Sequence, residues 1–191
     1  MAATNQKVKF GFSNVHYALL KEGNTFDTPK PIKGGVKVSL TAEGSQSTFH
    51  ADNCAYVVFS TNGGYTGEIE FAYMTPEMAK DLLGEKAAAN GVNYEISNAK
   101  PVQFALLYEV SGNTEDNRYA MYNCTASRAD KSAETTGDDI TPGTVTLKFT
   151  AIPYDVKGEP VVYGWVENTE TSKKAYEQWM TKVTLPGEAI V

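Results

Sequence analysis

Residues 65–85, YTGEIEFAYMTPEMAKDLLGE, change abruptly from the two-residue repeat of a β-strand to the repeat of an α-helix. In the first half, apolar side chains alternate with small or charged ones, which places the two sets on opposite faces of a sheet. Thr75 suits a helix N-cap and Pro76 the first helical position, so we expect a short helix over 76–83 that ends at Gly84. The expected inward set is Tyr65, Gly67, Ile69, Phe71 and Tyr73, and the outward set is Thr66, Glu68, Glu70 and Ala72.

Alternating segments recur along the chain without the strand–helix–strand rhythm of a parallel sheet. The clearest expected strands are 7–12 and 15–21, or one strand with a break at Ser13-Asn14, followed by 36–41, 101–110, 118–125 and 144–151. A second helix is expected at 171–182, where Ala175 and Trp179 are four residues apart and share a face. The chain, residues 1–191, is therefore expected to be a single mainly β domain. The expected fold is an antiparallel β-sandwich with one short flanking helix and a second, C-terminal helix.

The segments between these elements contain recognisable turn and loop sequences. Asn62-Gly63 has the composition of a tight hairpin turn, because both residues readily adopt positive φ values. We expect this turn to join the apolar run 55–59 to the strand that begins at Tyr65. The polar segment 43–48 is expected to be a hairpin tip or a mobile loop. Segment 128–143 is a long polar loop, expected to be mobile or to dock on a partner.

Charge and composition argue against a protein that grips nucleic-acid phosphates. The net charge is −6, and the basic residues, almost all lysine, form no continuous stripe. The first residues lack the apolar segment of a signal peptide, and no window approaches the ~20 apolar residues of a membrane span. Cys54 and Cys124 suggest no disulfide framework. These features predict a mildly acidic, soluble protein made in a reducing cytosol.

Segment 50–54, HADNC, is the only local cluster of ionisable and metal-ligating side chains. A zinc site needs three or four ligands, and the other histidine, His16, has no second ligand near it in the sequence. A nucleophilic pair of Cys54 and His50 would also need an orienting group and an oxyanion site. We therefore expect no catalytic residue, no metal and no cofactor. Segment 50–54 is interpreted as a strand edge whose Asp and Asn side chains form turn hydrogen bonds.

Glu68 and Glu70 share one face of a strand and lie ~6.6 Å apart along it. This spacing is compatible with the paired acids of glycoside hydrolases, although a Glu-x-Glu strand more often presents a solvated face. No phosphate-binding glycine loop or nucleophile elbow accompanies the pair. Two weaker alternatives stay open. One is a stand-alone β-sandwich module that binds carbohydrate or protein, and the other is a hydrolase that uses Glu68/Glu70 or His50/Cys54.

Two segments, YTGEIEFAYMTPEMAKDLLGE at 65–85 and YNCTASR at 122–128, are the most specific parts of a wider similarity. The other matching segments are PVQFALLYEV at 101–110, TVTLKFTAIP at 144–153 and AYEQWM at 175–180. In this order and spacing, they resemble the major tail protein family of long-tailed, siphovirus-type bacteriophages, which build the tail tube. The resemblance covers most of the chain from about Lys7 onward.

This resemblance implies a structural virion protein rather than an enzyme. Members of the family look like β-sandwich domains with a flanking helix that form six-membered rings around a channel and stack into a tube. The implied location is the phage tail, after synthesis in the bacterial host cytoplasm. The implied partners are further copies of the chain, a tape-measure protein, and tail terminator and distal tail proteins. Double-stranded DNA would pass through the lumen, and no membrane insertion is implied.

The resemblance also leads to expectations about individual surfaces. Segments 43–48 and 128–143 are candidates for reaching the next ring, because polar loops can become ordered on assembly. Glu68 and Glu70 are candidates for lining the channel. Two carboxylates on the polar face of a strand would repel DNA and leave it mobile.

Overall fold

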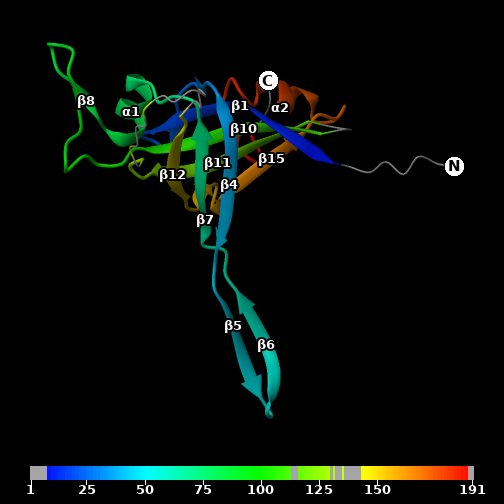
Figure 1. Cartoon of the computed structure of the whole chain (residues 1–191). Coiled ribbons are helices and arrows are strands. Elements are labelled where there is room, and N and C mark those ends of the chain that lie inside the picture. The colour runs from blue at the N-terminus through cyan, green and yellow to red at the C-terminus, as the bar shows by residue number, and fades with distance from the viewer. Residues whose placement is uncertain (1–7, 113–115, 130, 132–134, 136–142, 189–191) are drawn as a thin grey trace.

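The computed structural model describes residues 8–112, 116–129, 131, 135 and 143–188. Its largest element is an antiparallel sheet of nine strands. These strands are β1 (Lys9–Lys21), β2 (Thr25–Phe26), β3 (Lys30–Ile32), β4 (Gly35–Glu43), β7 (Gly64–Phe71), β10 (Gln103–Gly112), β11 (Asn117–Ala126), β12 (Val145–Ala151) and β15 (Tyr163–Glu167). Seven of them follow the order β2–β1–β10–β11–β12–β7–β4, while β15 pairs with β11 and β3 pairs with β1 (Figure 1). The expectation of a mainly β, antiparallel fold is confirmed.

Three two-stranded ribbons and two helices complete the described part of the chain. The ribbons are β5 (Gln46–Ala51) with β6 (Cys54–Ser60), β8 (Lys86–Ala87) with β9 (Asn93–Tyr94), and β13 (Tyr154–Val156) with β14 (Glu159–Val161). The helices are α1 (Pro76–Leu83) and α2 (Lys173–Gln178). Among the described residues, neither helix has the length and apolar character needed to cross a membrane.

The large sheet bends so that β4 lies against β1, which gives the fold its sandwich-like character. A Cβ atom at Gly35 would lie only 2.9 Å from Cγ2 of Val15 and 3.0 Å from Cε1 of Phe12. Glycine at this position therefore permits the close approach of the two strands. The main hydrophobic core lies inside this bend, and its most buried members include Tyr17, Ile69, Phe71, Phe104, Leu106, Met121 and Leu147.

The expected alternation along β7 is largely confirmed. Gly67, Ile69 and Phe71 are buried, whereas Glu68 is exposed. Tyr73 was expected on the inward face, but it is 65% exposed. The reason is that β7 ends at Phe71, so the two-residue repeat no longer governs the direction of the next side chains.

Helix α1 occupies the range expected from the sequence, 76–83. The Thr75 side chain accepts a hydrogen bond from the Met78 backbone N–H at 3.2 Å, and Gly84 adopts the left-handed conformation that ends the helix. On the sheet side, Tyr17 donates its hydroxyl hydrogen to Asp81 at 3.0 Å, and burial raises the pKa of Tyr17. Fully buried Leu82 fixes the apolar side of the helix, so these contacts hold α1 against the sheet.

Helix α2 is shorter than the expected 171–182. The Trp179 N–H bonds to the Tyr176 carbonyl three residues back, which tightens the helix end and directs Trp179 into a second core. This core lies on the other face of β10, where Leu107 is buried. Nε of Arg118 donates to Glu109 at 2.6 Å, while the guanidinium lies 3.9 Å from the centre of the Tyr176 ring. This contact anchors α2 to the sheet.

The prediction of a hairpin turn at Asn62-Gly63 is wrong. Strand β6 pairs with β5 and not with β7, and the turn between them is at Asp52-Asn53, where φ is 50° and 63°. Two consecutive positive φ values match the turn type favoured in two-residue hairpins. The Gly63 N–H donates to the Glu43 carbonyl at 2.7 Å, which extends the pairing of β4 with β7. Segment 43–48 is accordingly not a hairpin tip: it comprises the end of β4, the connection at 44–45 and the start of β5.

Candidate assembly and channel surfaces

The outward side of β4, β7 and β12 consists of Glu, Lys, Ser and Thr side chains. Residues directly opposite one another in antiparallel strands point to the same side of a sheet. The strand register therefore arranges nine side chains in three rows, which we call the three-strand face. The rows are Thr41–Thr66–Thr150, Ser39–Glu68–Lys148 and Lys37–Glu70–Thr146.

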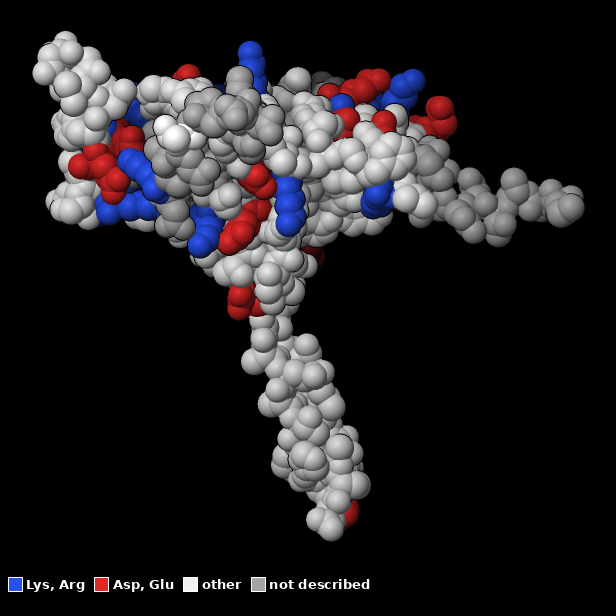
Figure 2. Space-filling view, viewed as in Figure 1, with Lys and Arg blue, Asp and Glu red and all other residues white. Residues whose placement is uncertain are grey.

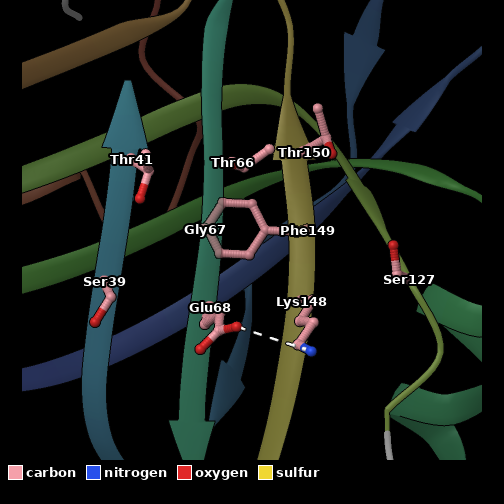
Figure 3. A pocket seen from close by; sticks show the side chains of 9 residues that line it. All are labelled: Ser39, Thr41, Thr66, Gly67, Glu68, Ser127, Lys148, Phe149 and Thr150. Carbon is pink, nitrogen blue, oxygen red and sulfur yellow. Dashed lines mark ion pairs between the residues drawn. The ribbon is translucent and has the colours of Figure 1, made fainter. Parts of the chain in front are cut away.

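Gly67 sets the spacing of the strands beneath the three-strand face. A Cβ atom at this position would lie 2.6 Å from Cζ of Phe149 and 2.9 Å from Cδ2 of Leu40. Figure 3 shows the Phe149 ring lying across Gly67, with hydroxyl and charged side chains on the strands around it. The inward Phe149 ring fills the space beside Gly67, and the outward surface above it is a shallow hollow rather than a deep, enclosed pocket.

The structure places Glu68 and Glu70 on this polar side, as expected, but each of them has a lysine directly opposite. Nζ of Lys148 lies 4.0 Å from Oε1 of Glu68, and both side chains are about half exposed. Lys37 is opposite Glu70, whose Oε1 accepts a hydrogen bond from the Thr144 hydroxyl at 2.6 Å. Figure 2 shows positive and negative side chains intermingled over the sheet. The face is therefore charge-balanced rather than acidic.

A second surface is the ribbon of β5 and β6, which we call the arm. It projects away from the sheet from the ends of β4 and β7 (Figure 1). Between Glu43 and Glu68 the only residue that is charged at neutral pH is Asp52, at the tip of the arm (Figure 2). The arm nevertheless exposes five large apolar side chains, namely Phe49, Tyr56, Val57, Val58 and Phe59. A two-stranded ribbon with exposed apolar side chains is at best marginally stable in water by itself.

The aromatic rings of the arm contact each other but no other part of the described chain covers them. Phe49 and Tyr56 form an edge-to-face pair with centroids 6.4 Å apart, yet they remain 57% and 68% exposed. At the root of the arm, hydrogen bonds between Thr61 and Ser45 replace the regular backbone ladder of paired strands. The Thr61 N–H donates to the Ser45 carbonyl at 2.9 Å, and the Thr61 hydroxyl oxygen accepts from the Ser45 N–H at 2.9 Å. These bonds connect the arm to the sheet.

The structure does not assemble the sequence cluster at 50–54 into a reactive site. His50 and Cys54 are exposed near the tip of the arm, and the Cys54 thiol donates to the Ala51 carbonyl at 3.2 Å. His16 lies on β1, in the large sheet. Among the described residues, no group of three or more His, Cys, Asp or Glu side chains is placed to hold a metal ion. Cys124 is buried, and burial raises the pKa of its thiol.

Most of the long loop expected at 128–143 lies outside the described residues. Its first residue, Arg128, is well fixed. Nε of Arg128 lies 2.6 Å from Oε1 of Glu95, and Nη2 donates to the Ile96 carbonyl at 3.0 Å. The loop therefore starts from a side chain bonded to the segment that follows β9.

Sequence reasoning missed two features of these surfaces. The lysines of the three-strand face belong to the same alternating segments that predicted the strands, with Lys37 and Lys148 in the polar sets. The sequence therefore indicated that both lysines belong to polar strand faces, although it did not indicate which strands pair with each other. The arm carries a signal as well, because 24 residues with a single charge are unusual for a segment that points into solvent.

A comparison of the chain with known protein families and with curated proteins finds no match. The three-strand face and the arm therefore carry the functional interpretation.

Proposed function

We propose that this chain is a structural subunit of a phage tail tube, which assembles with copies of itself into stacked rings around a channel. The observation that carries the proposal is the arm. Contiguous exposed apolar surface on a soluble protein marks a site of interaction. Fully burying one large apolar side chain contributes about 1.5–3 kcal/mol, so covering several arm residues would favour assembly strongly.

The direction of the arm supports a polymer rather than a closed pair. The arm points away from its own sheet (Figure 1), so it is free to lie on the sheet of a partner molecule, which is a different surface. Contacts between two different surfaces are heterologous, and they generate rings or open stacks. A tail tube needs both kinds of contact.

The sheet supports the proposal in a second way. Strand β4 is the last in the strand order, and such an edge strand is a site at which a neighbouring copy can continue a sheet. A sheet extended in this way would present the three-strand face as a continuous polar surface. A surface of hydroxyls and balanced charges suits a channel through which double-stranded DNA passes. A tape-measure protein, tail terminator and distal tail proteins, and location in the virion belong to the same proposal.

Electron microscopy of concentrated, purified protein tests the proposal. We expect hollow tubes or stacked rings from the unmodified chain. The variant Phe49→Ser/Tyr56→Ser/Phe59→Ser should remain monomeric, because it removes the apolar surface of the arm. The matched control is Val92→Ser/Tyr94→Ser, which changes exposed apolar residues near the β8–β9 ribbon and should still assemble.

Two outcomes would contradict the proposal. One is an unmodified protein that stays monomeric at high concentration and binds a glycan or an unrelated protein, which is the behaviour of a stand-alone binding module. The other is normal tube formation by the variant with the altered arm. Analytical ultracentrifugation of the same samples measures the size of the species in solution.

A further inference from the structure

The chain contains two Asn-Gly pairs, Asn62-Gly63 and Asn90-Gly91, and the structure places them in different surroundings. An asparagine that precedes glycine is especially open to attack by its own chain, because glycine has no side chain to shield its backbone nitrogen. That nitrogen can bond to the side-chain amide carbon of the asparagine and close a five-membered ring. The backbone around each pair therefore decides whether this reaction occurs in the folded protein.

Asn90-Gly91 lies in the exposed turn that joins β8 to β9. Oδ1 of Asn90 accepts a hydrogen bond from the Val92 N–H at 3.3 Å, and the Gly91 N–H donates to the Ala88 carbonyl at 3.0 Å. Both bonds are local to the turn. Gly91 has a φ of +83°, and beyond its chain neighbours no described heavy atom lies within 4 Å of the position that a Cβ atom would take there. Tertiary packing therefore does not oppose a change in the backbone angles of this turn.

Asn62-Gly63 has an equivalent side-chain hydrogen bond but a different setting. Oδ1 of Asn62 accepts from the Gly64 N–H at 3.1 Å, whereas the Gly63 N–H donates across the sheet to the Glu43 carbonyl at 2.7 Å. The next residue, Gly64, is buried, and a Cβ atom there would lie 2.1 Å from the carbonyl oxygen of Ala151. The Gly63 nitrogen is thus held in the pairing of β4 with β7, and it becomes available only when this end of the sheet opens locally.

We propose that Asn90 is a site of self-modification, where the side-chain amide is lost through attack by the Gly91 backbone nitrogen, and that the sheet protects Asn62 from the same reaction. The Gly91 nitrogen gives up its proton to hydroxide and bonds to Cγ of Asn90. The bond between Cγ and Nδ2 then breaks, and ammonia leaves after taking a proton from water. Water opens the resulting succinimide ring. Cleavage at Cγ gives aspartate, and cleavage at the backbone carbonyl carbon gives isoaspartate.

The Val92 N–H assists this reaction. Negative charge develops on Oδ1 of Asn90 as the new bond forms, and the Val92 N–H already donates to that oxygen. A backbone donor placed where charge develops lowers the barrier, in the manner of an oxyanion hole. Asn62 has the equivalent donor in Gly64, so the two pairs differ in the availability of the attacking nitrogen and not in this contact. Either product adds one negative charge to the β8–β9 turn, and isoaspartate also lengthens the backbone by one carbon.

The test follows both asparagines in the folded, full-length protein during incubation at mildly alkaline pH in water labelled with heavy oxygen. Mass spectrometry of the digested protein detects the labelled oxygen that ring opening introduces, which separates this reaction from any that occurs during digestion. Asn90 should react at least about 10-fold faster than Asn62, because freeing the Gly63 nitrogen costs more than the net contribution of one hydrogen bond. The reaction at Asn90 should become faster as pH rises, because hydroxide removes the Gly91 proton.

Two controls assign the difference to the fold. In guanidinium chloride, which unfolds the chain, the two asparagines should react at similar rates because both precede glycine. Asn90→Gln should suppress labelling at position 90, since glutamine would have to close a larger ring, and circular dichroism verifies the fold of this variant. The inference is overturned if Asn90 reacts no faster than Asn62 in the folded chain, or if a difference of the same size persists in the unfolded chain. Neither result depends on whether the chain forms tubes.

Discussion

Strands β6 and β10 are both apolar, but only one of them belongs to a core. All seven residues of β6, CAYVVFS, are exposed, whereas five consecutive residues of β10, 104–108, are buried. Strand β10 lies between β1 and β11, and its two faces contact two separate cores. Among the described strands, β6 pairs with β5 alone. An apolar run thus enters a core only where other elements cover it.

This difference separates the stability of the single chain from the assembly that we propose for it. The apolar surface of β10 is removed from water when one chain folds, so it contributes to the free energy of unfolding. The apolar surface of β6 remains in water, and only a partner can cover it. Mutations in the two strands should therefore affect different measurements.

The largest expected effect is on unfolding. Leu106 on β10 is 1% exposed, so Leu106→Ala should lower the free energy of unfolding by about 2–5 kcal/mol. Val58→Ala on β6 should change it by less than about 0.5 kcal/mol, because that side chain is already exposed. Urea unfolding of dilute, monomeric protein measures both values. Equal losses in the two variants would show that the arm is covered within a single chain.

An intermediate effect is expected at alkaline pH, where buried tyrosines of the sheet, but not those of the arm, should cause a loss of stability. Burial raises the pKa of Tyr108 above its usual value of 10. Below about pH 10 the stabilisation is fully present, and it is lost as pH rises, because the unfolded state releases a proton that the folded state retains. Tyr108→Phe should reduce this alkaline loss by about 1.4 kcal/mol per pH unit above 10. Urea unfolding at several pH values measures the loss.

The exposed tyrosine of the arm gives the control for that measurement. Tyr56→Phe should leave the alkaline loss of stability unchanged, since the side chain is mostly in water. If Tyr56→Phe reduced the alkaline loss of stability as much as Tyr108→Phe, that result would contradict the distinction between arm and sheet.

The smallest effect is expected at the boundary between the two regions. Thr61→Ala removes the hydroxyl that accepts from the Ser45 N–H and donates to the Ser45 carbonyl. Because this junction is exposed, the free energy of global unfolding should fall by no more than about 1 kcal/mol. Hydrogen exchange should instead become faster at Ser45, as the arm opens locally. Faster exchange throughout β7 would indicate that arm and sheet unfold together.

The parts of the fold that depend on neighbouring residues could be predicted from the sequence. Thr75, Pro76 and Gly84 define α1 through contacts within a few residues, and the expected range was correct. The two-residue repeat likewise placed Ile69 inward and Glu68 outward. These signals are local, so they hold whatever the rest of the chain does.

The wrong predictions concern pairing between strands that are distant in the sequence. Asn62-Gly63 has the composition of a hairpin turn, but β7 pairs with β4 and β12 instead of β6. Asp52-Asn53 supplies the turn, and nothing local ranks one of these pairs of residues above the other. The same limit applies to the three-strand face. The outward position of Glu70 followed from the repeat, whereas its position opposite Lys37 depends on register between separate strands.

The isolation of the arm also has a consequence for how sequences of this kind can diverge. Because the exposed residues of β5 and β6 contribute little to the folding of their own chain, substitutions there escape the packing constraints that act on β10. In the proposed assembly, two chains with the same sheet and different arms would fold alike and yet fail to recognise one another. Compatibility between copies can therefore change in a few mutational steps, while the fold is inherited intact.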